Sequence, residues 1–270
     1  MENLLTSSSN SSREWNSSQY HRLSQPQLSW GKKLLSRLQL RGDELLLDAG
    51  CGTGRLTAEL LQALPQGRVI GVDISQNMLG TASDHLKAKF GQRVDLVVAD
   101  LQALPFENAF DGIVSTAAFH WVPDHDRLFR SLRGALRRSG WLHAQCGGGP
   151  NLLNLRNRVN KLATTPPYAS FFASFREPWV FADAETAADT LQRAGFLDIE
   201  AGLESAFTIL DDSTQYSEFL PAIILRTHLE CLPDSDLRAR FVADLTEQAA
   251  ADDPPFSLDY WRLNLSAKAS

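Results

Sequence analysis

The chain has 270 residues, of which 43% are hydrophobic and 21% charged, as in an ordinary globular protein. A formal net charge of −6 counts against a general nucleic-acid-binding protein, which needs a basic face to neutralise phosphates. No apolar run reaches the length of a membrane span, and three cysteines without zinc-like spacing indicate neither a disulfide framework nor a metal site. We therefore expect a cytoplasmic protein without a metal.

The N-terminal part of the chain falls into two segments. Residues 1–14 are rich in serine and asparagine and have no apolar core, which predicts a flexible tail and not a signal peptide. Apolar residues then recur at helical spacing between 28 and 40. We expect residues 15–42 to form a helical lid.

Residues 43–147 alternate between short apolar runs and helical patterns. The runs predict strands, and the expected elements in chain order are a strand at 45–49, a helix at 53–64, a strand at 69–73, a helix at 76–87, strands at 94–99 and 110–115, a helix from Pro123 to 136 and a strand at 140–146. This alternation predicts a Rossmann-like α/β fold, with a doubly wound, mostly parallel seven-stranded sheet.

The alternation breaks after residue 147. Residues 148–182 contain glycines, prolines and aromatics and indicate a cap insertion, after which residues 183–211 restore one helix and one strand, 197–210. Residues 212–255 are helical in pattern, with Pro233 between two helices, and residues 256–270 hold the final strand at 258–267. We expect the two helical segments to form a substrate cap on the core.

The strongest chemical signal is a glycine-rich turn between the first strand and its helix. Residues 48–54 read Asp-Ala-Gly-Cys-Gly-Thr-Gly. Glycines let a ligand approach the backbone closely, and amides at a helix start can receive a carboxylate or phosphate. Ligands of open α/β sheets bind beyond the carboxyl ends of the strands, where this turn lies. A tight connection without a ligand is the alternative explanation of the turn alone.

Two further strands end in aspartates. Asp73 ends the second strand, where a carboxylate can accept hydrogen bonds from a ribose diol, and Asp100 ends the third, where it could accept from an adenine amino group. One such aspartate is more often a turn or cap residue. Together with Asp48, three successive strands end in an aspartate, and this set predicts a nucleotide-like ligand.

The spacing of the glycines bears on which ligand this is. The turn reads Gly-x-Gly-x-Gly, whereas the dinucleotide fingerprint is Gly-x-Gly-x-x-Gly. A pyrophosphate would gain nothing from Asp48, but a ligand with an amino group and a sulfonium would. An NAD-dependent oxidoreductase is the alternative from another class, and a binding protein without turnover is a third.

Residues 45–54, 69–75 and 97–101 together resemble the motifs of class I S-adenosylmethionine-dependent methyltransferases. The N-terminal Trp15, Tyr20 and Gln27, and the runs at 118–125 and 259–264, resemble the trans-aconitate 2-methyltransferase-like group. The resemblance covers nearly all of residues 15 to 267. It implies methyl transfer from S-adenosyl-L-methionine to a small molecule.

The resemblance also implies roles for individual residues. The glycine-rich turn would hold the methionine part of the cofactor, Asp73 the ribose, Ile74 and Met78 the adenine faces, and Asp100 the adenine edge. The full set implied to bind the cofactor is Tyr20, Gln27, Asp48, Gly50, Cys51, Gly52, Thr53, Gly54, Asp73, Ile74, Met78, Asp100, Leu101 and Ala117. For Ile74, Met78 and Leu101, core packing explains the pattern equally well.

The acceptor that the resemblance favours is a small carboxylic acid, methylated on oxygen; a phenol or an amine is the alternative. A carboxylate needs a cationic clamp more than a base, and arginine suits a bidentate grip. Arg226 in the expected cap and Arg262 in the last strand are the candidates, and Trp121 is a candidate wall of the pocket. His120 is the candidate base, with packing under the cap as its alternative.

The N-terminal segment departs from the group at one point. Gln27 and Ser29 stand near the positions where trans-aconitate enzymes carry arginines, so a tricarboxylate would be poorly held. The acceptor itself and the oligomeric state do not follow from the sequence.

Overall fold

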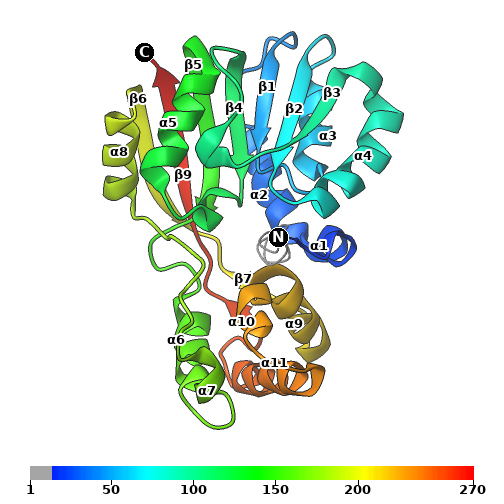
Figure 1. Ribbon diagram of the computed structural model, residues 1–270, viewed down its shortest axis with the longest axis vertical. Helices are drawn as coiled ribbons and strands as arrows, with labels where there is room; N and C mark the ends of the chain where they lie inside the picture. Colours follow the sequence, from blue (N-terminus) through cyan, green and yellow to red (C-terminus); the bar gives the residue numbers. More distant parts are fainter. Residues whose placement is uncertain (1–13) are drawn as a thin grey trace, which may run out of the picture.

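The computed structural model describes residues 14–270, and its main body is one seven-stranded sheet (Figure 1). The strands are β1 (Leu45–Ala49), β2 (Arg68–Asp73), β3 (Val94–Val98), β4 (Phe110–Thr116), β5 (Leu136–Gly147), β6 (Phe196–Ser205) and β9 (Trp261–Ala269). Their order is β3-β2-β1-β4-β5-β9-β6, and only β9 runs antiparallel to its neighbours. The predicted Rossmann-like, mostly parallel sheet is confirmed.

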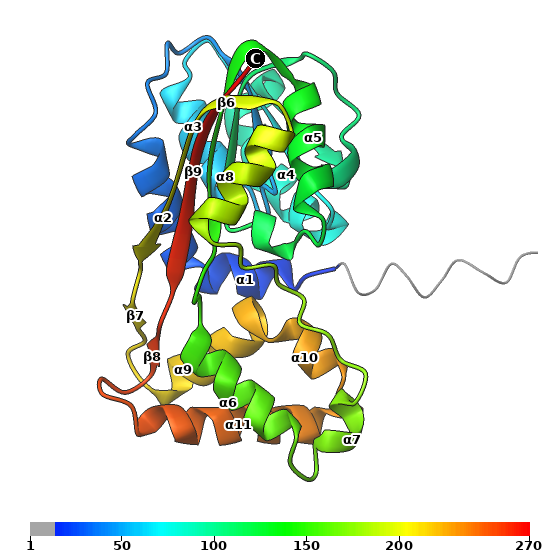
Figure 2. The same ribbon diagram turned by 90° about the vertical axis from the view of Figure 1, so that its left-hand side faces the viewer.

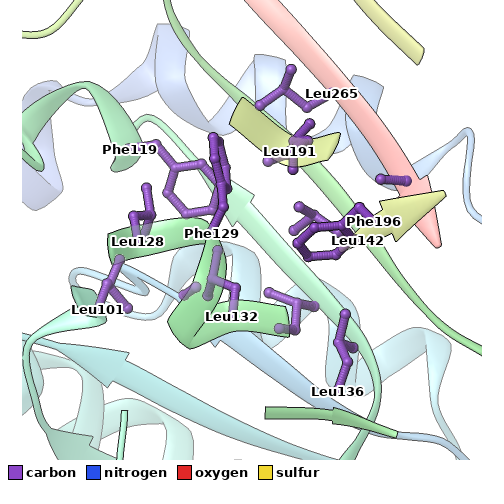
Figure 3. Close-up of a cluster of buried hydrophobic side chains, with 14 of the residues drawn as sticks. Leu101, Phe119, Leu128, Phe129, Leu132, Leu136, Leu142, Leu191, Phe196 and Leu265 are labelled. Carbon is purple, nitrogen blue, oxygen red and sulfur yellow. The ribbon is translucent and has the colours of Figure 1, made fainter. Parts of the chain in front are cut away.

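Helices cover both faces of the sheet. One face carries α2 (Gln25–Leu35), α3 (Arg55–Ala63) and α4 (Gln76–Phe90), and the other carries α5 (His125–Ala135) and α8 (Ala184–Arg193). Successive side chains of a strand point to opposite faces, so Leu46 of β1 packs in the first layer and Leu47 in the second. Figure 3 shows the second layer, where Phe129 and Leu132 of α5 meet Leu191 of α8.

The starts of α4 and α5 are set by side chains that cap them. The Ser75 hydroxyl accepts a hydrogen bond from the Met78 amide at 3.2 Å and caps α4, as its position before the helix predicts. The expectation that Pro123 lies in the first turn of α5 is wrong. Asp124 caps that helix by accepting from the Arg127 amide at 2.9 Å, so the helix begins at His125.

The strand expected at 197–210 is interrupted. Its first part is β6, and its end is β7 (Thr208–Ile209), which pairs with β8 (Ser257–Leu258) in a separate two-stranded sheet. The last strand is likewise divided into β8 and β9. At this point both chain segments leave the core and run toward the cap, and the Ala206 amide donates to the Tyr260 carbonyl at 2.8 Å.

Five helices form the cap, which lies beyond the sheet (Figure 2). They are α6 (Leu153–Ala163), α7 (Ala169–Phe172), α9 (Ser213–Phe219), α10 (Arg226–Glu230) and α11 (Ser235–Ala250). Pro233 separates the last two, as expected. The cap has its own hydrophobic core, in which Tyr168, Tyr216 and Phe241 are buried.

The N-terminal helix α1 (Ser17–Leu23) lies between the sheet and the cap (Figure 2). Of the predicted flexible tail, residues 1–13 lie outside the described residues. Its last residue, Glu14, is held at the start of α4. Its carboxylate accepts hydrogen bonds from the Ser75 hydroxyl and the Gln76 and Asn77 amides, at 2.9, 3.1 and 3.0 Å. Between residues 14 and 270, no helix is both long and apolar enough to cross a membrane.

Candidate functional site

The glycine-rich turn lies against β2 at the carboxyl edge of the sheet. The Gly50 amide donates to the Val72 carbonyl at 2.8 Å. Gly50 has φ +79°, and a Cβ there would collide with the Ala118 Cβ. Gly52, with φ +53°, faces open space, since a Cβ there would meet nothing within 4 Å. The turn therefore requires glycine for its conformation and exposes backbone on one side.

Two of the predicted aspartates are held by backbone amides. The Asp73 carboxylate accepts from the Gly52 and Ser75 amides, both at 2.9 Å, and burial raises its pKa. Asp100 accepts from the Gln102 amide at 2.9 Å. A carboxylate has about four lone-pair sites, so each can still accept hydrogen bonds from a ligand.

A cavity of about 390 Å³ opens beside these residues, at the carboxyl ends of β1 to β4. We call it the outer cavity. The predicted site residues that line it are Tyr20, Gly50, Gly52, Asp73, Ile74, Met78, Asp100, Leu101, Ala117, Trp121 and Arg226. The other lining residues are Trp15 of the predicted lid and Ala99, Gln102, Thr116, Ala118, Val122, Pro123, Pro178 and Thr227.

Four residues predicted to contact the cofactor line neither this cavity nor the inner one described below. Asp48, which is 1% exposed, accepts from the Thr57 hydroxyl of α3 at 2.6 Å, and burial raises its pKa to about 7. Cys51 packs on Gly71 of β2. The Thr53 hydroxyl bonds His21 Nδ1 at 2.9 Å, and a Cβ on Gly54 would lie 2.5 Å from Leu86. Asp48 and Gly54 therefore face α3 and α4, Cys51 faces β2 and Thr53 faces α1, so all four shape the turn from outside the cavity.

A second, smaller cavity of about 40 Å³ adjoins the first. We call it the inner cavity. Tyr20, Ala117 and Trp121 line both cavities, and Ala117 adopts φ +59°, an uncommon conformation for a non-glycine residue. The remaining lining residues of the inner cavity are Gln27, Trp30, His120, Asn151, Leu152, Trp179, Phe181, Ile223, Ile224, Tyr260 and Arg262.

Arg262 is the outstanding group of the inner cavity. It is 2% exposed, and its guanidinium lies 4.2 Å from the centre of the Trp30 ring. Its Nε and Nη2 have no hydrogen-bond partner among the described residues. Burial lowers its pKa to about 10, so it remains a cation at neutral pH.

The acid that lies opposite Arg262 in the sheet is bound elsewhere. Glu204 pairs with Arg262 in the β6–β9 register, but its carboxylate forms an ion pair with Lys33 and a second with Arg37 at 3.5 Å. Within residues 14–270, no carboxylate pairs with Arg262. A buried cation without an anion is costly, which fits a site that receives an anion.

Further polar atoms around this cavity lack partners in the described part of the chain. They are the Tyr260 hydroxyl and Gln27 Oε1. Burial raises the pKa of Tyr260, so its hydroxyl keeps its proton and can donate it in a hydrogen bond.

His120 lines the inner cavity, as expected of a site residue. Its Nδ1 accepts from the Gly147 amide at 3.2 Å. Because a backbone amide always donates, the proton of the neutral ring lies on Nε2. Burial holds the pKa of His120 well below its ordinary value. The geometry therefore makes His120 a neutral hydrogen-bond donor and disfavours its use as a general base.

Arg226 lies in the outer cavity, away from Arg262. It forms an ion pair with Glu230 at 2.7 Å, and its guanidinium lies 4.9 Å from the Trp15 ring. Trp15 in turn packs edge-to-face on Trp121 at 5.1 Å. The N-terminal segment and the cap thus meet over the outer cavity.

Trp30 and Tyr260 are two of the lining residues that sequence reasoning missed. Tyr260 stands two residues before Arg262, and on an extended chain such residues share a face, so this signal was available. Trp30 contacts Tyr260 edge-to-face at 4.9 Å, yet in sequence it reads only as the apolar face of a helix.

The sequence is similar to those of known methyltransferases. A family model described as a methyltransferase domain matches residues 46–140. A trans-aconitate 2-methyltransferase of Deinococcus radiodurans is 30% identical over 210 residues, which cover 78% of this chain and 75% of that protein. One from Methylobacterium radiotolerans is 29% identical over 90% of this chain and 92% of its own.

The solved structures extend the likeness to the fold. Phosphoethanolamine N-methyltransferase 2 of Haemonchus contortus, in complex with S-adenosyl-L-methionine, aligns with a TM-score of 0.58 at 20% identity. The alignment covers 90% of this chain and 53% of that one.

Proposed function

The chain belongs to the trans-aconitate 2-methyltransferase-like group of class I S-adenosylmethionine-dependent methyltransferases, and on that premise we propose that it methylates a small carboxylic acid on oxygen. It is an enzyme with S-adenosylmethionine as cofactor, so the NAD-dependent alternative is set aside. The observation that carries the choice of acceptor is Arg262, a buried cation without an anionic partner in residues 14–270, beside the outer cavity.

The residues of the outer cavity fit the cofactor. The open backbone at Gly52 leaves room for its amino-acid part, Asp73 can accept from the ribose hydroxyls, and Asp100 can accept from the adenine amino group. Ile74, Met78 and Leu101 provide apolar contacts for the adenine, while Tyr20 and Ala117 lie at the passage to the inner cavity. When bound, S-adenosylmethionine supplies a methyl group on a sulfonium whose sulfur leaves as a neutral thioether.

The inner cavity favours a carboxylate over a phenol or an amine. A carboxylic acid is already ionised at neutral pH and needs no base to become a nucleophile. A phenol or ammonium would have to lose a proton, and His120, with Nδ1 occupied and its pKa depressed by burial, is poorly suited to take one. Arg262 can orient a carboxylate through its planar fork.

We also propose that the acceptor is a small molecule and not a nucleic acid, and that the enzyme acts in the cytoplasm. The net charge of −6 and the small size of the inner cavity support the first statement. The second rests on the unpaired cysteines and the sequence composition.

The test is a screen with a methyl-labelled donor. The panel contains mono-, di- and tricarboxylic acids, phenols and amines, and the products are separated by whether alkali releases the label, as it does from methyl esters. We expect alkali-labile product from at least one acid. We expect Arg262→Ala to abolish it, with a smaller loss for Arg226→Ala. Labelled ethers or N-methyl products without any ester would reject the carboxylic acid and leave the methyltransferase assignment standing.

A further inference from the structure

The inner cavity holds a single permanent charge. Of its lining residues, all of which are described, Arg262 is the only lysine, arginine, aspartate or glutamate. His120 is neutral, and much of the remaining wall is apolar, including Trp30, Leu152, Phe181 and Ile223. The cavity is therefore built for one anionic group in apolar surroundings.

The other cations near the site are already engaged, including Arg156, which forms an ion pair with Glu177 at 3.8 Å and lies over the Phe181 ring. Arg226 is paired with Glu230 and lies against the Trp15 ring. Arg55 donates to the His21 carbonyl at 3.0 Å and to the Ser24 hydroxyl at 3.3 Å. A second carboxylate on the acceptor would find no cation free to receive it without breaking one of these contacts.

Burial of an unpaired carboxylate is strongly unfavourable, so each additional carboxylate would weaken binding or keep part of the acceptor in water. The size of the cavity adds a second restriction. At about 40 Å³, the inner cavity is roughly a tenth of the outer cavity's 390 Å³, which leaves room for a small acceptor only. Both restrictions favour a short acceptor with one charged end.

We propose, on the basis of the function above, that the acceptor is a short monocarboxylic acid with an apolar body, held by its carboxylate on Arg262. The relatives are named for a tricarboxylate, so this chain departs from them in the charge of its acceptor. The Tyr260 hydroxyl and the His120 ring lie around the same cavity as neutral donors.

The first experiment compares acids of similar carbon number that carry one, two or three carboxylates. Pentanoate and glutarate share five carbons, and glutarate carries the second carboxylate; tricarballylate and trans-aconitate carry three. Calorimetry with S-adenosylhomocysteine present measures binding without turnover. We expect pentanoate to bind at least about tenfold more tightly than any of the polycarboxylates. Equal or tighter binding of glutarate, tricarballylate or trans-aconitate would overturn the proposal.

The second experiment removes the charge of the clamp. Arg262→Met should weaken pentanoate binding by more than about tenfold and leave S-adenosylhomocysteine affinity within about twofold. It should also raise Tm by about 2–4 °C, because a buried unpaired charge is gone. A purely structural arginine would give the opposite sign, so a lower Tm with unchanged pentanoate affinity would contradict the proposal.

Two further variants control the measurement. Arg262→Lys keeps the charge without the planar fork and should retain part of the pentanoate affinity. Arg138→Met makes the same substitution at an exposed arginine near the start of β5, at the other end of the sheet, and should change neither affinity. The two proposals fail separately: methyl esters formed mainly from polycarboxylates would refute the monocarboxylate, whereas no ester from any acid would refute the proposed function.

Discussion

The outer and inner cavities adjoin, but the fold holds the groups proposed to bind ligand in them differently. In the outer cavity, Asp73 and Asp100 are held by backbone amides of the neighbouring turns. In the inner cavity, Arg262 and the Tyr260 hydroxyl are buried with hydrogen-bonding atoms that no other described group satisfies. The cofactor side is therefore stabilised by the fold itself, while on the acceptor side the fold leaves charge for a ligand to neutralise.

The largest effect is expected at the turn of the outer cavity. Gly50→Ala places a Cβ against Ala118 and forces a left-handed conformation on alanine, so we expect cofactor affinity to fall by more than about 100-fold. Gly80→Ala is the control, because Gly80 lies exposed in α4 with open space around it. The free energy of unfolding of this variant should rise by about 0.5–1 kcal/mol. Calorimetry and thermal unfolding of both variants test this. Similar cofactor affinities in the two would remove the turn from the site.

A smaller loss of cofactor affinity is expected when the Asp73 carboxylate in the outer cavity is neutralised. Asp73→Asn loses charge-assisted hydrogen bonds to the proposed ribose and to a backbone amide, each worth about 1.5–3 kcal/mol. We expect cofactor affinity to fall by roughly 10–100-fold, with pentanoate affinity measured separately in the same titrations. A variant that binds S-adenosylhomocysteine as tightly as the wild type would refute the ribose assignment.

The N-terminal segment should contribute less. Glu14→Ala removes three hydrogen bonds to the start of α4, next to Asp73, and we expect cofactor affinity to fall by roughly three- to tenfold. Hydrogen exchange in residues 15–30 should slow on addition of S-adenosylhomocysteine in the wild type, and slow less in the variant. Hydrogen-exchange rates in residues 15–30 that are the same with and without cofactor, in both proteins, would count against a lid.

The smallest effect on affinity is expected at Asp48, which lies behind the turn. Asp48→Asn should leave cofactor affinity within about threefold and instead change the dependence of stability on pH. The folded pKa of about 7 exceeds the ordinary aspartate pKa of 3.8, so the folded state binds the proton more tightly and Asp48 destabilises the fold increasingly as pH rises between these values.

The Tm of Asp48→Asn relative to wild type should therefore be higher at pH 8 than at pH 4.5. The matched comparison is Asp73→Asn, because Asp73 at the end of β2 lines the outer cavity. Loss of cofactor affinity in Asp48→Asn equal to that in Asp73→Asn would show that the carboxylate reaches the cofactor after all.

The outer cavity was easier to predict from the sequence than the inner cavity, because its lining residues cluster in short sequence motifs. The outer cavity uses strand ends and one turn, so Gly50, Asp73 and Asp100 carry a local signal that the sheet brings into register. Asp48 carried the same signal but points the other way, because it lies in β1 on the same face as Leu46, which is the face that α3 covers.

The inner cavity had almost no local signal. Its wall comes from α2, the loop after β4, the start of α6, the π-helical turn after α9 and the start of β9, so residues far apart in the chain meet only in the folded cap. Arg262 was a candidate on chemical grounds, but its burial depends on the folded cap, and its lack of an acidic partner on Glu204 binding Lys33 and Arg37. Such pairings among side chains are not encoded in spacing.

The most direct test of the two-cavity account is a crystal structure with S-adenosylhomocysteine and pentanoate. The account predicts the nucleoside against Asp73 and Asp100 in the outer cavity. It also predicts the pentanoate carboxylate on the Arg262 guanidinium in the inner cavity, with its chain among Trp30, Ile223 and Ile224. Pentanoate bound away from Arg262, or Arg262 paired with a protein carboxylate while the acid occupies the cavity, would contradict it.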